Sequence, residues 1–200
     1  MWILTDVPLR RRPWANLLLI LVNLGAFLIQ LSQPQFMSRH MLNAHRPDLG
    51  QFITYAFLHI SPGHLIFNML VLWMLGNNVN DRLGHIGYLA FYLAAAVFSG
   101  MGFLLSGGQA IVGASGAIGA VMGIYLVFFP RSTIRIPLGR LSFQAPAMHF
   151  VVLFLVYSIL MSFIGELTVQ QVAYEAHLAG MAFGFAIGLL LVRLSLAESR

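Results

Sequence analysis

The chain has 200 residues, of which 59% are hydrophobic and only 8% are charged. A soluble domain has roughly 25% charged residues, and a soluble chain of this length could not bury so much apolar surface. The composition therefore excludes an ordinary soluble domain and indicates a single-domain integral membrane protein in a lipid bilayer. The chain contains no Cys, which excludes disulfides, thiolate catalysis and Cys-based zinc sites.

The net charge of +5 comes from eleven basic residues, all of them Arg. In a soluble protein this excess would suggest a nucleic-acid partner. Here the Arg residues lie in short segments between apolar stretches, where they act as topology signals. We therefore expect no nucleic-acid partner.

Six apolar segments are long enough to be predicted as membrane spans, which need about 20 mostly apolar residues. They cover residues 14–31, 63–79, 86–105, 113–129, 147–164 and 172–194. The sequence thus predicts an all-α polytopic bundle over residues 14–194, with a short N-terminal segment (1–13) and a tail (195–200). The first segment is too long for a signal-peptide core, so we interpret it as a retained anchor. Because only the short segment 1–13 precedes it, we expect no separate cytosolic domain.

The Arg residues also predict the orientation of the bundle. With the N-terminus in the cytoplasm, only Arg39 and Arg46 lie outside, and this asymmetry favours two cytoplasmic termini. The Arg residues then inside are Arg10, Arg11, Arg12, Arg82, Arg131, Arg135, Arg140, Arg193 and Arg200. Asn77-Asn78 and Pro130-Arg131 are predicted as cytoplasmic turns. The first loop, about 32–62, contains enough apolar residues to predict interfacial helices.

Four polar residues within the spans require an explanation, because such residues are costly in lipid and are often functional. They are His64, Asn68, Ser115 and His177. In the predicted orientation all four lie near the outer face. His64 and Asn68 are spaced i, i+4 and share one helix face. For this pair alone, hydrogen bonding between helices is an equally good explanation.

Ser115 lies in Gly113-Ala114-Ser115-Gly116 at the start of the fourth segment. The flanking glycines allow close backbone approach, and unpaired N–H groups at a helix N-terminus could stabilise an oxyanion. Taken alone, however, Ser115 is better explained as a cap or a small packing residue.

His177 precedes Gly180, Gly184 and Gly188, which are spaced by four and form a smooth helix face. If the fourth and sixth segments pack through their glycines, His177 meets Ser115. Histidine is the usual base that activates a serine hydroxyl. Developing negative charge would then need donors, which His64, Asn68 and the backbone of Ser115 could supply.

These residues resemble the rhomboid family of intramembrane serine proteases over about residues 50–192. His64-x-x-x-Asn68 is similar to the family motif of the second helix, and Gly113-Ala114-Ser115-Gly116 to the motif before the fourth. Ala176-His177-x-x-Gly180-x-x-x-Gly184 resembles the motif of the sixth helix. Each motif is weak alone, but the three in this order are specific.

The resemblance implies a Ser–His dyad in which Ser115 is the nucleophile and His177 the general base and then acid. His64, Asn68 and the Ser115 backbone would form the oxyanion site, with Gly113, Gly116, Gly180 and Gly184 packing the helices around it. Transmembrane proteins would be cleaved near the outer face, without cofactor or metal. The fifth helix and the loop 165–171 would resemble the gate and cap. We expect a multi-pass protein of the bacterial inner membrane; the oligomeric state is left open.

Three positions depart from the family pattern. Gly119 stands where an aromatic residue often stacks on the catalytic histidine, so His177 must be held in another way. Asn80, followed by Asp81, stands where an acidic residue is common, and a Trp-Arg pair of the first loop is absent.

Three alternatives to a protease fit the sequence less well. The first is a non-catalytic rhomboid-like protein that binds membrane clients, although such relatives usually lack the serine or the histidine. A transporter or channel would be expected to carry charged residues deep in its spans. A zinc site formed by His59, His64 and His177 would leave the serine without a role.

Overall fold

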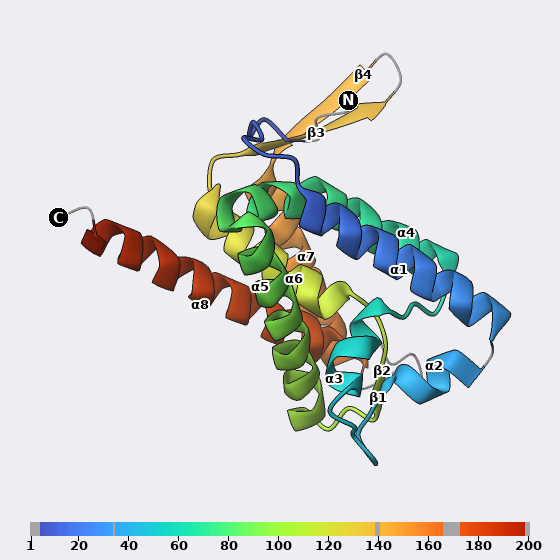
Figure 1. The fold of residues 1–200 in the computed structure, drawn as a ribbon. Helices are drawn as coiled ribbons and strands as arrows, with labels where there is room; N and C mark the ends of the chain where they lie inside the picture. Colours follow the sequence, from blue (N-terminus) through green and yellow to red (C-terminus); the bar gives the residue numbers. More distant parts are fainter. Residues whose placement is uncertain (1–4, 34, 139–140, 166–172, 199–200) are drawn as a thin grey trace.

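The computed structural model describes residues 5–33, 35–138, 141–165 and 173–198. Helices dominate these residues, and four short strands accompany them (Figure 1). The helices are α1 Trp14–Ser32, α2 Gln35–His40, α3 Gln51–Thr54, η1 Tyr55–Phe57, α4 Pro62–Val71, η2 Leu72–Gly76, α5 Asn77–Leu105, α6 Ser115–Phe128, α7 Ala147–Gly165 and α8 Tyr174–Glu198. The strands are β1 Leu42–Asn43, β2 Ala110–Ile111, β3 Thr133–Leu138 and β4 Leu141–Pro146. The loop proposed as a cap falls almost entirely on residues 166–172, outside the described residues.

Helices occupy most of the described residues in each of the six segments that the sequence predicts as spans. Within the described residues, three stretches are long and apolar enough to cross a membrane: Trp14–Ser32, Pro62–Leu105 and Tyr174–Ser195. Ser115–Phe128 and Ala147–Ser162 form shorter apolar helices. The fold is therefore mostly helical, as predicted, while the count of six spans and the cytoplasmic termini stay predictions.

The turn predicted at Asn77-Asn78 is wrong. The chain continues from α4 through the π-helical turn η2 into α5, and the break comes later, at Gly84, whose φ of 73° interrupts the helix. The asparagines bond to other elements instead of turning the chain. Asn77 Oδ1 accepts from Asn16 of α1, and Asn78 Oδ1 accepts from the Thr5 hydroxyl.

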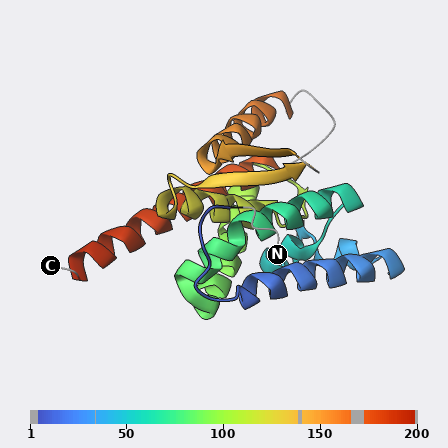
Figure 2. The same cartoon turned by 90° about the horizontal axis from the view of Figure 1, so that it is seen from above.

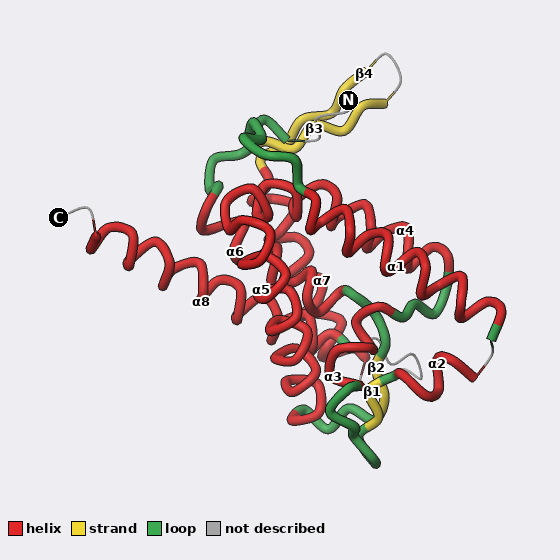
Figure 3. The backbone as a smooth tube through the Cα atoms, viewed as in Figure 1, coloured by secondary structure: helices red, strands yellow, loops and turns green. Residues whose placement is uncertain are grey.

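The two small sheets were not expected from the sequence. β1 pairs with β2 and joins the first loop to the segment before α6, while β3 and β4 form a hairpin between α6 and α7 (Figure 3). Thr5 adds an isolated bridge to Ile134 of that hairpin. β1 and β2 have two residues each and pair across more than 60 residues, so no local pattern predicts their pairing.

Helix α6 lies at the centre of the bundle, where every residue from Gly116 to Tyr125 is buried. It packs most extensively against α8, and also against α5. α1 and α4 run side by side, and the C-terminal part of α8 extends away from the other helices (Figure 2). The N-terminal ends of α4, α6 and α8 therefore meet on one side of the core, which brings the polar residues of three helices together.

Candidate active site

The backbone at Gly113 places Ser115 at the first position of α6. Gly113 has a φ of 127°, which side-chain-bearing residues rarely adopt, and its N–H donates to the Tyr55 carbonyl at 2.9 Å. A Cβ at this position would lie 2.8 Å from Cε1 of His64. Because α6 begins at Ser115, the N–H groups of its first turn have no partner within the helix.

The structure brings Ser115 and His177 together. Nε2 of His177 lies 2.8 Å from Oγ of Ser115, within hydrogen-bonding distance. The glycines of α8 permit this approach, because a Cβ on Gly180 would collide with the Gly116 carbonyl and one on Gly184 with the Ala120 carbonyl. In the structure α6 and α8 therefore pack through small residues, which is the condition under which His177 meets Ser115.

The ring of His177 is held mainly by α7, with Tyr174 of its own helix. A Cβ on Gly119 would lie 2.8 Å from the His177 carbonyl, so this backbone contact leaves no room for an aromatic side chain there. The Phe154 ring lies 5.2 Å from the imidazole, centroid to centroid, and the Tyr174 ring meets it edge-on at 5.8 Å. Oγ of Ser158 lies 3.4 Å from Nδ1 of His177.

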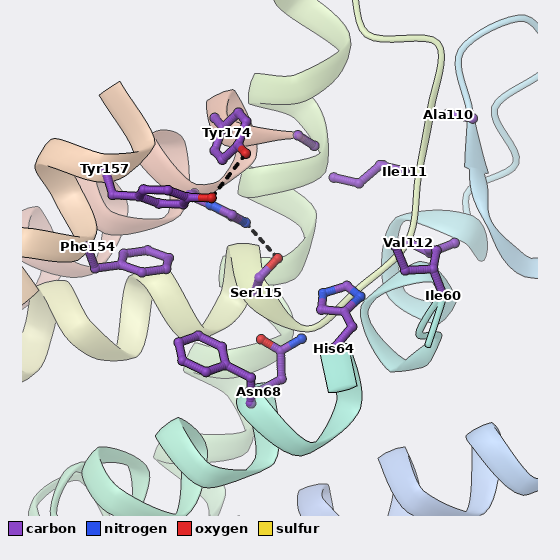
Figure 4. Close-up of a pocket in the computed structure, with 13 residues that line it drawn as sticks. Ile60, His64, Asn68, Ala110, Ile111, Val112, Ser115, Phe154, Tyr157 and Tyr174 are labelled. Carbon is purple, nitrogen blue, oxygen red and sulfur yellow. Dashed lines mark hydrogen bonds between the residues drawn. The ribbon is translucent and has the colours of Figure 1, made fainter. Parts of the chain in front are cut away.

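His64 and Asn68 face the same cavity as Ser115, from the first turns of α4 (Figure 4). The Ser61 hydroxyl caps this helix by accepting from the His64 N–H at 3.2 Å. Asn68 is 2% exposed, and among the described residues its Nδ2 has no hydrogen-bond acceptor. The same holds for Nδ1 of His64. Both side chains thus retain hydrogen-bonding capacity next to Ser115.

The cavity has a volume of about 530 Å³ and is lined mostly by apolar and aromatic side chains. The lining that the sequence did not identify comprises Ile60, Phe67, Ala110, Ile111, Val112, Phe154, Tyr157, Ala173 and Tyr174. One of them could have been found, because Tyr174 precedes His177 by three residues and so shares its helix face. The others depend on how α7 and the β2 segment pack. Such a lining favours an apolar ligand over a polar solute.

His59 is a further buried histidine beside the site. It is fully buried, and its ring lies 5.0 Å from that of His64. Burial, and secondarily the neighbouring His64, lower the pKa of His59 to about 3. His59 is therefore neutral at physiological pH. The described residues contain no group of three or more His, Cys, Asp or Glu side chains arranged to hold a metal ion.

The fold and the site define an integral membrane protein in which a serine and a histidine from two helices meet at one cavity. Residues 46–194, about three quarters of the chain, match the Rhomboid domain family. The chain belongs to the rhomboid family, which confirms the resemblance seen in the sequence.

Named relatives agree with this assignment. The chain is similar to proteins named Rhomboid protease GlpG. The one from Yersinia pestis (strain Pestoides F) is 31% identical over 137 residues, which cover 68% of this chain and 46% of the relative. The one from Yersinia enterocolitica is 29% identical over 168 residues, or 84% of this chain and 55% of the relative. The chain thus spans about half the length of the curated relatives it matches.

Proposed function

We propose that the protein is an intramembrane serine endopeptidase with a Ser115–His177 dyad. The observation that carries this proposal is the 2.8 Å contact between Oγ of Ser115 and Nε2 of His177 at the wall of the cavity. A serine hydroxyl is a weak nucleophile until a base takes its proton, and a neutral imidazole nitrogen at this distance is suited to do so. Membership of the rhomboid family and the names of the relatives support the same activity.

The reaction follows from these two side chains. Nε2 of His177 takes the proton of the Ser115 hydroxyl as Oγ attacks the carbonyl carbon of the scissile peptide bond. The tetrahedral intermediate collapses when the C–N bond breaks and His177 returns the proton to the leaving amine. Water then hydrolyses the ester to Ser115, with His177 again acting first as base and then as acid.

The oxyanion of the intermediate would be stabilised by three donors: the side chains of His64 and Asn68 and the backbone N–H of Ser115. Both side chains line the cavity from α4, and their polar atoms are not consumed by other contacts among the described residues. Donors that are already in place when charge develops stabilise the transition state most.

The substrates in this proposal are transmembrane segments of other membrane proteins, cleaved near the outer membrane face. The apolar lining of the cavity and the orientation predicted from the Arg residues support this choice. We further propose that the protein works in the bacterial inner membrane and needs no cofactor.

The proposal can be tested with a fluorophosphonate probe and a model transmembrane substrate. Purified protein in detergent should react covalently with the probe and cleave the substrate, and Ser115→Ala and His177→Ala should each lose both activities. Ser195→Ala, an exposed serine in α8, is the matched control and should behave like the unaltered protein. A Ser115→Ala variant that still cleaves would refute the proposal. Substrate binding without labelling or cleavage in the unaltered protein would instead support a non-catalytic client-binding protein.

A further inference from the structure

Ser158 is a polar side chain that the apolar helix α7 directs at the dyad. It is fully buried, and its Oγ lies 3.4 Å from Nδ1 of His177, on the opposite side of the ring from Ser115. We propose that Ser158 is the positioning residue for His177, taking the part that an aspartate plays in a Ser-His-Asp triad. This inference rests on the proposed function of the dyad.

The tautomer that His177 needs as a base explains why Nδ1 requires a hydrogen-bond acceptor. If Nε2 accepts the proton of Ser115, the single proton of the neutral ring must be on Nδ1. That N–H points at Ser158, whose hydroxyl oxygen can accept it. Without Ser158, the free-energy difference that favours the Nδ1-protonated tautomer over the Nε2-protonated one would be smaller. In the Nε2-protonated tautomer this nitrogen carries a proton and cannot act as the base.

The hydrogen bond between Nδ1 of His177 and the Ser158 hydroxyl becomes stronger as the reaction proceeds. When His177 takes the serine proton it becomes an imidazolium, and a hydrogen bond from a charged donor is stronger than one from a neutral donor. The nearest acid in sequence does not serve this role, because the Glu175 carboxylate accepts from the Ser162 hydroxyl at 2.7 Å. The hydroxyl of Ser158 is therefore the acceptor available to Nδ1 among the described contacts of His177.

Two neighbouring contacts between α7 and α8 provide an internal comparison. Ser162 lies one turn after Ser158 on α7 and bonds to Glu175, and the hydroxyl groups of Tyr157 and Tyr174 lie 3.4 Å apart. These contacts hold the two helices together without touching the imidazole nitrogens. A loss of activity confined to the Ser158 variants would thus indicate a change in the orientation of His177. An equal loss in the Ser162 variant would indicate a change in the packing of α7 against α8.

The experiment compares four variants: Ser158→Ala, Ser158→Val, Ser158→Thr and Ser162→Ala. Thr and Val have the same shape, but only Thr keeps the hydroxyl, so their comparison separates hydrogen bonding from packing. The measurements are kcat and KM for the transmembrane substrate and the rate of fluorophosphonate labelling, which reports on the dyad with a small reagent. Thermal unfolding in detergent identifies any variant that does not fold.

We expect Ser158→Ala and Ser158→Val to lower kcat and the labelling rate by about 10- to 100-fold, the range of a hydrogen bond to a charged group. KM should change little, because Ser158 does not line the cavity. Ser158→Thr should recover most of the activity lost in Ser158→Val, and Ser162→Ala should label at nearly the unaltered rate.

Three results would overturn the inference: unaltered kcat and labelling in Ser158→Ala, equal losses in Ser158→Ala and Ser162→Ala, or no advantage of Thr over Val. In each of these cases the unaltered protein is active and loses activity with Ser115→Ala, so the proposed function stands. Absence of labelling and cleavage in the unaltered protein is a different result and counts against the proposed function itself.

Discussion

At the scale of single residues, the proposed chemistry depends on the close approach of His64 and Ser115 to the backbone at Gly113. A Cβ on Gly113 would lie 3.1 Å from Nε2 of His64 and 3.6 Å from Oγ of Ser115. The glycine therefore lets the histidine ring approach the serine from the side where an oxyanion would form. The backbone conformation and the space requirement favour glycine for independent reasons.

The oxyanion assignment makes a residue-level prediction. Replacing His64 or Asn68 by Ala should lower kcat by about 10²- to 10³-fold each, the usual cost of one lost oxyanion donor, with a smaller effect on KM. Steady-state cleavage of a transmembrane substrate measures both constants. His149→Ala, an exposed histidine on α7, is the control and should leave kcat unchanged. If the two α4 variants kept full kcat, both side chains would be structural.

His59 makes a prediction about stability and pH. Its pKa is lowered in the folded protein to about 3 from an ordinary value of 6.5, so the unfolded chain binds the extra proton between these values. The neutral ring thus contributes stability above about pH 6.5, and this contribution is lost as the pH falls toward 3. From pH 7 to pH 5 the loss should be roughly 2 kcal/mol.

Thermal unfolding in detergent across this pH range measures the effect of His59. His59→Gln does not titrate and should flatten the dependence of the melting temperature on pH. His64→Gln is the parallel variant, because the ring of His64 lies 5.0 Å from that of His59 and its replacement shows how much this neighbour contributes. An equally steep pH dependence in His59→Gln would assign the effect to other groups.

At the scale of elements, the helices were predictable because the length of an apolar segment and the spacing of its glycines can be read directly from neighbouring residues. The spacing of Gly180 and Gly184 gives α8 a smooth face for close contact, and both glycines lie directly against backbone carbonyls of α6. The β3–β4 hairpin was missed although its six-residue strands have an ordinary length, because it lies between two long apolar segments that were interpreted as spans. The turn expected at Asn77-Asn78 failed because those amides bond to distant residues, which local turn propensities cannot reveal.

The packing of α6 against α8 predicts unequal effects for two glycines. Gly184→Ala should lower the melting temperature by roughly 3–10 °C and reduce labelling of Ser115, because its Cβ would collide with the Ala120 carbonyl. Gly25→Ala in α1 is the matched control, since nothing lies within 4 Å of the added carbon. Thermal unfolding and probe labelling in the same detergent compare them. Similar melting temperatures for the two variants would mean that α6 and α8 can separate at little cost.

At the scale of the whole molecule, the sequence predicts a site made of residues from three helices but not how its histidine is supported. The sequence singles out four candidates because each is polar and lies near the start of an apolar segment: His64, Asn68, Ser115 and His177. Phe154 and Ser158 could not be assigned, because their contacts with His177 depend on the rotation and depth of α7. No periodic pattern within α7 fixes either quantity, so the fold itself was needed to answer how His177 is held without an aromatic residue at Gly119.

The predicted orientation of the whole molecule can be tested by cysteine labelling, because the chain has no Cys of its own. In the predicted topology His45 in the first loop lies outside, and Ser195 near the end of α8 lies in the cytoplasm; both side chains are exposed. A membrane-impermeant maleimide should label His45→Cys in intact cells and label Ser195→Cys only after the membrane is permeabilised. The physical reason is that Arg-rich loops are retained on the cytoplasmic side. The opposite labelling pattern would place the N-terminal ends of α4, α6 and α8, and the Ser115 cavity with them, on the cytoplasmic side, and would exclude cleavage near the outer face.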